Sequence, residues 1–592
     1  MPTLRKSILT AAFVTGIAPG LAQAASGKFT AADYQRALWM ATRFYGGQRS
    51  GSGPNWLQMD SPNPTNYTND AVNGIDVSGG WFDCGDHEMY GQTQYWSAYT
   101  LAQAYEAFPT GFDDLYDGAN YSDYEKSQNF DITGGVPNGI PDIIDELVYE
   151  TDFIAKAAIS ETQFVAKKGV GSLDHGLWLT PGYESANKKS SEGGSSDGSR
   201  PITVDQGDGS MACYAAATLS IMSRNLTRLG LYASRASLYA QKAVIAYNYA
   251  KNHQTTVGVN DGGSYPANAN FKDDFATASL EMYRLTNDPS YLTTGTALAT
   301  SFKWGNNGLC YNDNEPQAFY NLYAIGGLTS SLSQLTGSSG VMNLYTSNLN
   351  SEGVSTVGDS WGALRYPLNG AYLGGLVDKL AGTDTYDQFI YNQVDYVMGG
   401  NAAKRSFITG FCSGCSSQPM YPQHRGIYLV NDLTWDKFNA TGTSNGLSIP
   451  ARNKYHGSLY GGSRISTGFT ESISNATTNE VCTDYNVGLV GALAYIVSKL
   501  APVDTSKFGP TALHARSYAA FDLSARAADR SILLSSSTPL QEVLVTDLQG
   551  RILAQSTPGT RSYHWTAPRP GLYLTRVRTA SGWASSKVLV EE

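Results

Sequence analysis

Charged side chains are scarce in this chain of 592 residues, and those present are biased toward acid. Asp, Glu, Lys and Arg make up 16% of the residues, below the quarter that is usual for soluble domains, and the formal net charge is -10. Because a phosphate backbone requires a basic protein surface, this balance argues against nucleic acid as the main partner. Beyond the N-terminal segment, the sequence also lacks an apolar run long enough to span a bilayer.

The N-terminus has the parts of a secretory signal peptide. Arg5 and Lys6 supply the positive start, an apolar run follows at 8–21, and Ala-Gln-Ala at 22–24 is a cleavage site. A membrane anchor is the alternative, but the run is too short for one. We therefore expect residues 1–24 to be removed and the mature chain to be secreted or attached to the cell surface.

Cysteine is also rare, with six residues in the whole chain: Cys84, Cys213, Cys310, Cys412, Cys415 and Cys482. An exported protein can form disulfides. Cys412 and Cys415 are spaced for a local disulfide, a redox motif or half of a metal site. The sequence has no second C-x-x-C and no thioredoxin-like context, so a structural role is favoured.

Helical periodicity extends from about residue 29 to about residue 500. In IPDIIDELVYETDFIAKA, Pro141 lies near the start, where its missing N–H costs little, and apolar residues recur at helical spacing. Long loops rich in Gly, Ser, Asn and Asp lie at 185–210 and 401–475, and no fixed-period repeat favours a solenoid. The pattern predicts a barrel of helical hairpins with a loop-lined cleft. Comparable segments lie at 30–45, 91–107, 211–229, 232–251, 272–286, 290–302, 318–336, 340–350, 366–381, 384–398 and 485–499.

The composition changes after Pro502. Short segments with alternating apolar residues, bounded by Gly, Pro and Ser, predict a small all-β, sandwich-like domain at 529–592. Residues 505–528 have the character of a linker. We therefore expect a helical catalytic domain at 25–504, a linker, and the β domain.

Two aspartates, Asp83 and Asp86, lie three residues apart in GGWFDCGDHEMYG. Such a pair could be a solvated turn. Hydrolysis of a glycosidic bond, however, needs one protonated carboxyl that donates to the leaving oxygen and one ionised carboxylate that attacks carbon or activates water. The aspartates are candidates for the ionised side, and Glu480, just before an apolar helix, is the candidate acid. The 38 tyrosines and 10 tryptophans also suit the binding of flat apolar sugar faces.

The surroundings of these residues resemble the cellulases of glycoside hydrolase family nine. The similarity extends over more than four hundred residues, and the motifs follow the family's order. The resemblance implies an all-α (α/α)6 barrel and inverting hydrolysis of β-1,4-glucans. The matching segments are FYGGQRSG at 44–51, GGWFDCGDH at 79–87, NGIPDIIDEL at 138–147, LDHGLW at 173–178, SWGALRY at 360–366 and NEVCTDYN at 479–486.

Position by position, the resemblance implies that Asp86 is the general base, that Asp83 helps to hold the same water, and that Glu480 is the general acid. Inversion requires the acid and base to be roughly 6.5–9.5 Å apart, so that water fits between base and sugar. The residues at substrate-binding positions are His175, Trp178, Asp273, Trp361, Tyr366, Gln423, His424, Arg425 and Tyr485.

The chain departs from the family pattern at several places. Gln423 occupies a position where the family usually has histidine. Cys84 and Cys482 replace alanines; since each lies within two residues of a carboxylate that must face the same sugar, we expect the two cysteines to be close and able to bond. The carboxylates of the family's calcium site are missing around 210–213, so no metal or other cofactor is expected to be required, although Asp273 could still bind metal or sugar.

The sequence thus predicts an exported, monomeric endo-β-1,4-glucanase. The alternatives are an exo-acting cellodextrinase or glucosidase-like relative, and a catalytically weak glycan-binding protein that keeps the cleft. The C-terminal domain resembles the β-sandwich sorting domains of gliding-type secretion systems, through VLVTDLQGRIL and GLYLTRVRT. That resemblance implies export or surface attachment through a secretion machinery; a carbohydrate-binding module is the other interpretation.

Overall fold

The computed structural model describes residues 26–51, 66–115, 137–171, 200–255, 265, 270–417, 422–424, 456–501 and 524–590, with short gaps at 207, 306, 473–474, 529–530, 537, 547–551 and 580–581. The expected signal peptide, His175, Trp178 and Arg425 lie outside these ranges. The chain forms two compact units, one made of residues 1–130 and 134–503 and the other containing 504–592.

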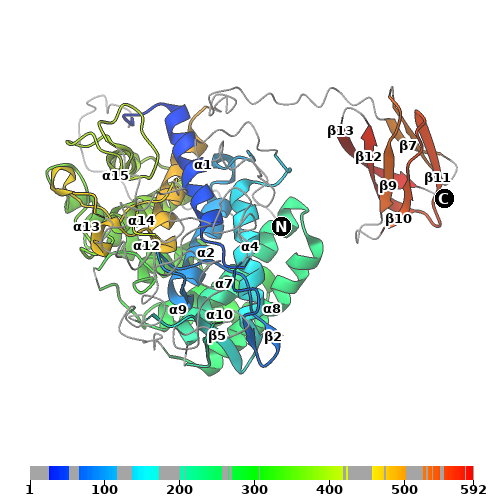
Figure 1. Ribbon diagram of the computed structural model, residues 1–592. Coiled ribbons are helices and arrows are strands. Elements are labelled where there is room, and N and C mark those ends of the chain that lie inside the picture. Colours follow the sequence, from blue (N-terminus) through cyan, green and yellow to red (C-terminus); the bar gives the residue numbers. More distant parts are fainter. Residues whose placement is uncertain are drawn as a thin grey trace, which may run out of the picture. The chain divides into compact units, whose positions relative to one another are not determined.

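The first unit is helical (Figure 1). Its described α-helices are α1 (Ala31–Gly47), α2 (Gly91–Ala107), α4 (Asp142–Ala157), α7 (Gly209–Leu229), α8 (Ala233–Asn252), α9 (Lys272–Thr286), α10 (Pro289–Ala297), α11 (Glu315–Ala324), α12 (Thr329–Thr336), α13 (Val341–Ser347), α14 (Arg365–Ala381), α15 (Asp387–Met398), α17 (Ala476–Asn479) and α18 (Thr483–Lys499). Single 3-10 turns lie at Pro109–Gly111 and Ser466–Gly468.

Six of these helices form a closed ring, because α2 packs on α7, α7 on α9, α9 on α11, α11 on α14, α14 on α18, and α18 on α2. A second layer covers the ring: α1 packs on α18, α4 on α2, α8 on α7, α10 on α9, α12 on α11 and α15 on α14. This is a barrel of two concentric helical layers, and it confirms the (α/α)6 prediction.

Most of each inner helix is buried, so apolar residues are not confined to one face, and polar residues are buried among them, such as Gln103, Glu281 and Gln317. In α18 the stretch GLVGALAY is wholly buried. A Cβ on Gly491 would come within 2.3 Å of the Tyr372 ring of α14, so glycine there permits the close approach of these two helices. In the outer layer, α1 begins at a capping box formed by Thr30 and Asp33.

Short antiparallel strands stand beside the barrel: β1 (Ala71–Val72), β2 (Ile75–Asp76), β3 (Met89–Tyr90), β4 (Ala158–Ser160), β5 (Gln163–Lys168) and β6 (Ile202–Val204). β1 and β2 form a hairpin, and β5 pairs with β3, β4 and β6. The β3–β5 pair fixes the C-terminal end of the loop that holds Asp83 and Asp86. None of the helices in the described ranges combines the length and the apolar character needed to cross a membrane.

The second unit is all-β, as predicted (Figure 1). Its strands are β7 (Ser524–Ala528), β8 (Ser531–Ser535), β9 (Glu542–Thr546), β10 (Ile552–Ser556), β11 (Ser562–Thr566), β12 (Gly571–Thr579) and β13 (Gly582–Val590). Two antiparallel sheets, β10-β9-β12-β13 and β11-β8-β7, enclose one hydrophobic core that includes Ile532, Val543, Tyr573 and Val588. β7 lies inside the range 505–528, which the sequence assigns to a linker.

Candidate active site

The loop that carries the two aspartates, residues 79–90 (the base loop), is held at both ends. At its start, the Ser50 N–H donates to Gly80 O at 2.7 Å, just after α1. At its end, β3 pairs with β5, and Lys167 of β5 forms a 2.5 Å ion pair with Glu88. Inside the loop, the Asp83 N–H donates to Glu88 O at 2.9 Å, which closes the loop on itself. Both aspartates therefore project from a fixed turn.

Asp83 lies at the bottom of this turn and is only 1% exposed. The Thr93 hydroxyl of α2 donates to one carboxylate oxygen and the Tyr265 hydroxyl donates to the other. Burial, together with the nearby charges of Asp86 and Asp484, raises the pKa of Asp83 well above its usual value. The hydrogen bonds from Thr93 and Tyr265 lower this pKa, but they do not cancel the effect of burial.

Asp86 is nearer the surface, at 6% exposure, and its Oδ1 accepts a 3.2 Å hydrogen bond from the Glu88 N–H. Asp484, in the first turn of α18, completes a set of three carboxyl groups that we name the base cluster: Asp83, Asp86 and Asp484. Arg365 of α14 forms a buried ion pair with Asp484. Arg365 thus places a full positive charge beside Asp484.

Glu480 lies in the short segment between α17 and α18 and is half-buried. Its backbone is fixed from two sides: Gln423 forms a parallel bridge with Glu480, and the Gly461 N–H donates to Glu480 O at 2.9 Å. After burial, Asp83, Asp484 and Glu480 are the charges that raise the pKa of Tyr265. Tyr265 therefore lies close to Asp83 and Asp484 of the base cluster and also to Glu480.

A disulfide between Cys84 and Cys482 joins the two segments directly, with the Cα atoms 3.8 Å apart and a sequence separation of 398. This confirms the expectation that these cysteines are close and bonded. Beside it, the Thr483 N–H donates to Asp83 O at 2.8 Å. A Glu480 carboxylate oxygen and the two sulfur atoms lie within 4.8 Å of one another, but the sulfurs are bonded to each other and are not available as thiolate metal ligands.

His424 and Gln423 support this arrangement through the base loop. The side-chain amide nitrogen of Gln48 donates to Cys84 O at 3.0 Å, and its oxygen accepts a hydrogen bond from the Nε2–H of His424 at 2.7 Å. A Cβ on Gly85 would come within 2.0 Å of Gln423 O, so only glycine fits there. The segment 422–424 thus packs against the base loop on one side and Glu480 on the other.

The predicted aromatic residues differ in exposure. Trp361 is 48% exposed, whereas Tyr366 and Tyr485 are buried. The Arg365 guanidinium lies over both tyrosine rings, 4.7 Å and 5.1 Å from their centroids. Trp361 is therefore the one of these three rings that has an open face for a sugar.

Sequence reasoning missed four residues that contact these groups: Thr93, Tyr265, Arg365 and Asp484. Arg365 and Asp484 lie inside the motifs SWGALRY and NEVCTDYN, next to the predicted site residues Tyr366 and Tyr485. Their charged side chains in these motifs could have identified them as further site residues. Tyr265 lies in GGSYPANAN, which has no pattern beyond that of a loop. Cys412 and Cys415 also form a disulfide, which agrees with their expected structural role.

Asp273 lies in the first turn of α9, buried beside Asp274 and close to Glu315 of α11; we name these three residues the α9–α11 cluster. Burial, then Asp274 and Glu315, raise the pKa of Asp273 well above its usual value. Burial, then Asp313 and Asp274, raise the pKa of Glu315 to about 8. Among the described residues, these carboxyl groups do not bring three ligand atoms within 4.8 Å of one another.

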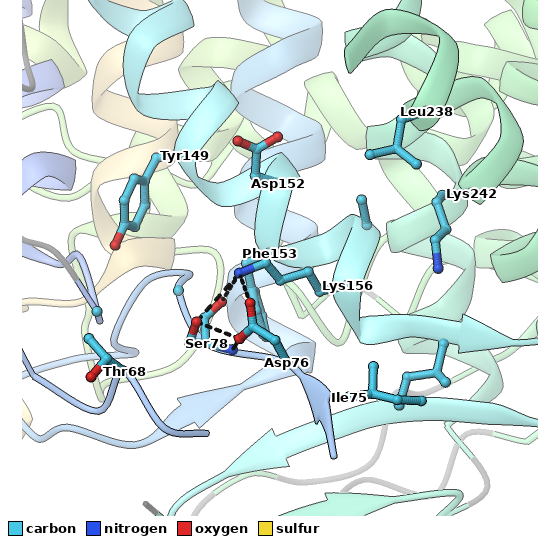
Figure 2. Close-up of a pocket in the computed structure, with 14 residues that line it drawn as sticks. Thr68, Ile75, Asp76, Ser78, Tyr149, Asp152, Phe153, Lys156, Leu238 and Lys242 are labelled. Carbon is cyan, nitrogen blue, oxygen red and sulfur yellow. Dashed lines mark hydrogen bonds and ion pairs between the residues drawn. The ribbon is translucent and has the colours of Figure 1, made fainter. Parts of the chain in front are cut away.

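A separate groove of about 540 Å³ lies between α4, α8 and the β1–β2 hairpin. Figure 2 shows Tyr149 and Phe153 of α4 on one wall, with Lys156 linked to Asp76 and Ser78. The Lys156–Asp76 distance is 2.8 Å. None of the three predicted catalytic carboxyl groups lines this groove, so it is not the catalytic cleft.

A helical barrel whose loops bring two aspartates and a glutamate together from opposite ends of the chain has the architecture of a glycoside hydrolase. Residues 34–493 match the model of glycosyl hydrolase family 9, so the chain belongs to this family.

Known relatives agree with this assignment. Endoglucanase A of Fibrobacter succinogenes is 34% identical over 443 residues, which cover 73% of this chain and 94% of that protein. An endoglucanase of Dictyostelium discoideum is 27% identical, covering 79% of this chain and 61% of that protein. The solved endoglucanase from the termite Nasutitermes takasagoensis has a TM-score of 0.63 at 24% identity, covering 79% of this chain and 99% of that one. Clostridium thermocellum endoglucanase CelQ, complexed with cellotriose, has a TM-score of 0.62 at 20% identity, covering 87% and 81%. Both structures share the fold.

Proposed function

We propose that Asp86, Asp83 and Glu480 make this protein an inverting endo-β-1,4-glucanase that acts on cellulose or a related β-glucan. The observation that carries the proposal is the convergence of the base loop and the Glu480 segment, which are joined by a disulfide and a backbone hydrogen bond. Support comes from membership of family 9 and from relatives that are endoglucanases.

The two aspartates divide one task. Burial and the charges of Asp86 and Asp484 raise the pKa of Asp83, and Asp86, which lies nearer the surface, is the carboxylate to which we assign the role of base. Asp86 removes a proton from the water that attacks the anomeric carbon, and Asp83 helps to hold the same water. Asp83 cannot rotate away, since hydroxyls from α2 and from Tyr265 grip both of its oxygens.

Glu480 acts as the general acid. As the glycosidic bond breaks, the Glu480 carboxyl protonates the departing oxygen, while the water oxygen bonds to carbon from the opposite face. One proton leaves Glu480 and one arrives at Asp86, so solvent exchange restores both groups. The half-buried position of Glu480 lets it reach a glycosidic oxygen that enters from the open side.

Substrate binding is proposed to involve Trp361, whose exposed ring offers an apolar platform to a glucose face. His424 and Gln423 act behind the carboxyl groups, by supporting the base loop. We further propose that the protein is exported as a monomer, on the basis of the signal-peptide pattern at 1–24 and the sorting-like β domain, and that this domain serves export or surface attachment.

The stereochemistry of the first product tests the mechanism. Proton NMR of early hydrolysis of a soluble β-1,4-glucan should show the α-anomer before mutarotation. An initial β-anomer would mean a covalent, retaining route and would remove the roles of Asp86 and Glu480 together.

Viscometry tests the mode of attack. Rapid loss of viscosity relative to reducing-sugar release on soluble cellulose is expected of an endo-acting enzyme. Sugar release with little loss of viscosity would show exo action, and binding without release would show a glycan-binding protein.

A further inference from the structure

The Cys84–Cys482 disulfide joins the two short segments that carry the proposed base and acid. Cys84 directly follows Asp83 and lies two residues before Asp86. Cys482 is the N-cap residue of α18 and lies two residues after Glu480. A single covalent bond therefore connects the base loop to the Glu480 segment.

We propose that this disulfide is a positioning clamp: it holds the base loop against the Glu480 segment at the separation that the reaction requires, so that turnover depends on the oxidised state of the bridge. The proposal rests on the proposed catalytic roles of Asp86 and Glu480. Cys84 and Cys482 are positioning residues, since they act through the carboxyl groups beside them.

The packing around the bridge explains why its loss would move the carboxyl groups. Cys84 is 3% exposed and Cys482 is 1% exposed, so two separate thiols, which cannot stay at bonding distance, have no free space to occupy. The neighbouring Gly85 is already in close contact with Gln423 O. Breaking the bond must therefore displace backbone in the base loop or in the Glu480 segment. A displacement of about 1 Å at a reacting group can reduce turnover roughly 100-fold.

The other links between these segments are weaker and do not replace the bond. The Thr483 N–H and hydroxyl donate to Asp83 O at 2.8 and 3.1 Å, whereas Gln48 donates to Cys84 O and ties the base loop to the end of α1. These hydrogen bonds, with the barrel behind them, are expected to keep the reduced protein folded. They fix the backbone at Asp83, whereas the bridge fixes the side of the loop that leads to Asp86.

The position of Glu480 also predicts how substrate affects the bridge. A Glu480 carboxylate oxygen lies within 4.8 Å of both sulfur atoms, and Glu480 is more exposed than either cysteine. A sugar bound against Glu480 would therefore lie between the bridge and the solvent. A bound cello-oligosaccharide should protect the bridge from reduction.

The second disulfide is a natural internal control. Cys412 is exposed, its bridge to Cys415 spans three residues, and neither of these two cysteines has a described contact with the three catalytic carboxyl groups. The remaining thiols, Cys213 and Cys310, are buried. Burial raises the pKa of Cys213 well above its usual value and raises that of Cys310 to about 12, so both react slowly with thiol reagents.

The first experiment reduces the full-length oxidised protein with a dithiol. The reagent gives two electrons and two protons, the S–S bond breaks, two cysteine thiols form, and the reagent closes to its own cyclic disulfide. Thiol trapping with peptide mapping follows each bridge in time. We expect the Cys412–Cys415 bridge to open first without loss of activity, and activity to fall in step with opening of the Cys84–Cys482 bridge and to return on reoxidation. Cellotetraose should slow opening of the Cys84–Cys482 bridge and leave the rate at Cys412–Cys415 unchanged.

The second experiment compares Cys84→Ala/Cys482→Ala with Cys412→Ala/Cys415→Ala. The first variant should lose roughly 10- to 100-fold in kcat, with KM within about threefold of the parent, since binding surfaces persist while positioning is lost. The second variant should keep the parent kcat. If the first variant does not fold, the reduction experiment on the parent protein still decides.

Full kcat after complete opening of the Cys84–Cys482 bridge, with a native circular-dichroism spectrum, would overturn the clamp. Loss of activity in step with opening of Cys412–Cys415 would overturn it as well. Failure of the catalytic assignment looks different: Glu480→Gln would then keep its activity while the Cys84–Cys482 bridge is closed.

Discussion

The helical unit contains two buried carboxyl clusters with similar electrostatics and different surroundings. Burial is the first cause of the raised pKa of Asp83 in the base cluster and of Asp273 in the α9–α11 cluster. Asp83, however, receives hydrogen bonds on both oxygens and is tied to the segment of Glu480. Asp273 Oδ1 has no hydrogen-bond partner among the described residues. A raised pKa thus reports burial, and the base cluster differs from the α9–α11 cluster in the hydroxyl donors on both Asp83 oxygens and in the disulfide that joins its loop to the Glu480 segment.

The largest expected effect separates the two clusters by activity. Asp86→Asn and Glu480→Gln should each reduce kcat on soluble cellulose by roughly 100- to 10,000-fold, since each removes a proton-transfer partner. Asp274→Asn, in the α9–α11 cluster, is the matched control and should change kcat less than about threefold, provided the fold is retained. Full activity in Asp86→Asn would show that the base lies elsewhere.

The roles within the active site should separate by leaving group. An activated aryl leaving group needs little protonation, so Glu480→Gln should be partly spared on an aryl β-cellobioside, whereas Asp86→Asn should be impaired on both substrates. Azide should restore some turnover to Asp86→Asn on the activated substrate. Asp83→Asn should be intermediate, because Asp86 still polarises a less well-held water. Equal losses of all three variants on both substrates would contradict this division of roles.

A smaller effect is expected from Tyr265→Phe, which removes one of the two hydroxyl donors to Asp83. We expect kcat to fall roughly tenfold, equivalent to about 1.4 kcal/mol. Since this hydrogen bond lowers the pKa of Asp83, its loss should move the pH profile of kcat upward. Tyr396→Phe is the control, because that hydroxyl donates to Ser463 O at 2.6 Å, away from the carboxyl groups. An unchanged kcat and pH profile in Tyr265→Phe would exclude a role for this hydrogen bond.

Glu315 tests the α9–α11 cluster through stability. Its folded-state pKa of about 8 lies above the usual value of 4.5, so its contribution to stability is fully present below about pH 4.5 and is lost as the pH rises toward 8. Glu315→Gln does not titrate. The variant should therefore gain stability relative to the parent between pH 5 and pH 8, by no more than a few kcal/mol, as measured by urea unfolding.

Glu352→Gln is a control for which we expect the opposite effect on stability at neutral pH. Burial acts to raise the pKa of Glu352, but hydrogen bonds from Ala402 and Ser466 lower it overall. A group of this kind stabilises the fold above its unfolded pKa, so the substitution should cost stability at neutral pH. Parallel pH dependence of the Glu315 and Glu352 variants would contradict the burial argument.

The smallest effect is expected outside the helical unit. Deleting residues 510–592 should leave specific activity on soluble glucan within about twofold of the full chain, because the β unit has its own hydrophobic core and the three carboxyl groups all lie in the helical unit. Activity of the purified truncated protein measures this. A large loss in a folded truncation would show that the β unit takes part in catalysis.

Much of the fold and the identity of the candidate carboxyl groups could be predicted from the sequence. Helical periodicity and the order of the motifs led to the two-layer barrel, because buried faces need apolar residues at fixed spacing. Alternation in the C-terminal segment predicted the β unit for the same reason. The closeness of Cys84 and Cys482 followed from their places beside carboxylates that must meet at one sugar.

The partners and the exposure of the site residues were decided by the tertiary structure alone. The Tyr265 hydroxyl reaches Asp83 across 182 residues of sequence, from a segment without periodicity. Trp361 is open while Tyr366 is buried under Arg365, although all three lie in one short motif. A sequence pattern records the spacing of residues along one element, whereas a hydrogen bond or an open ring face depends on which distant element packs beside it.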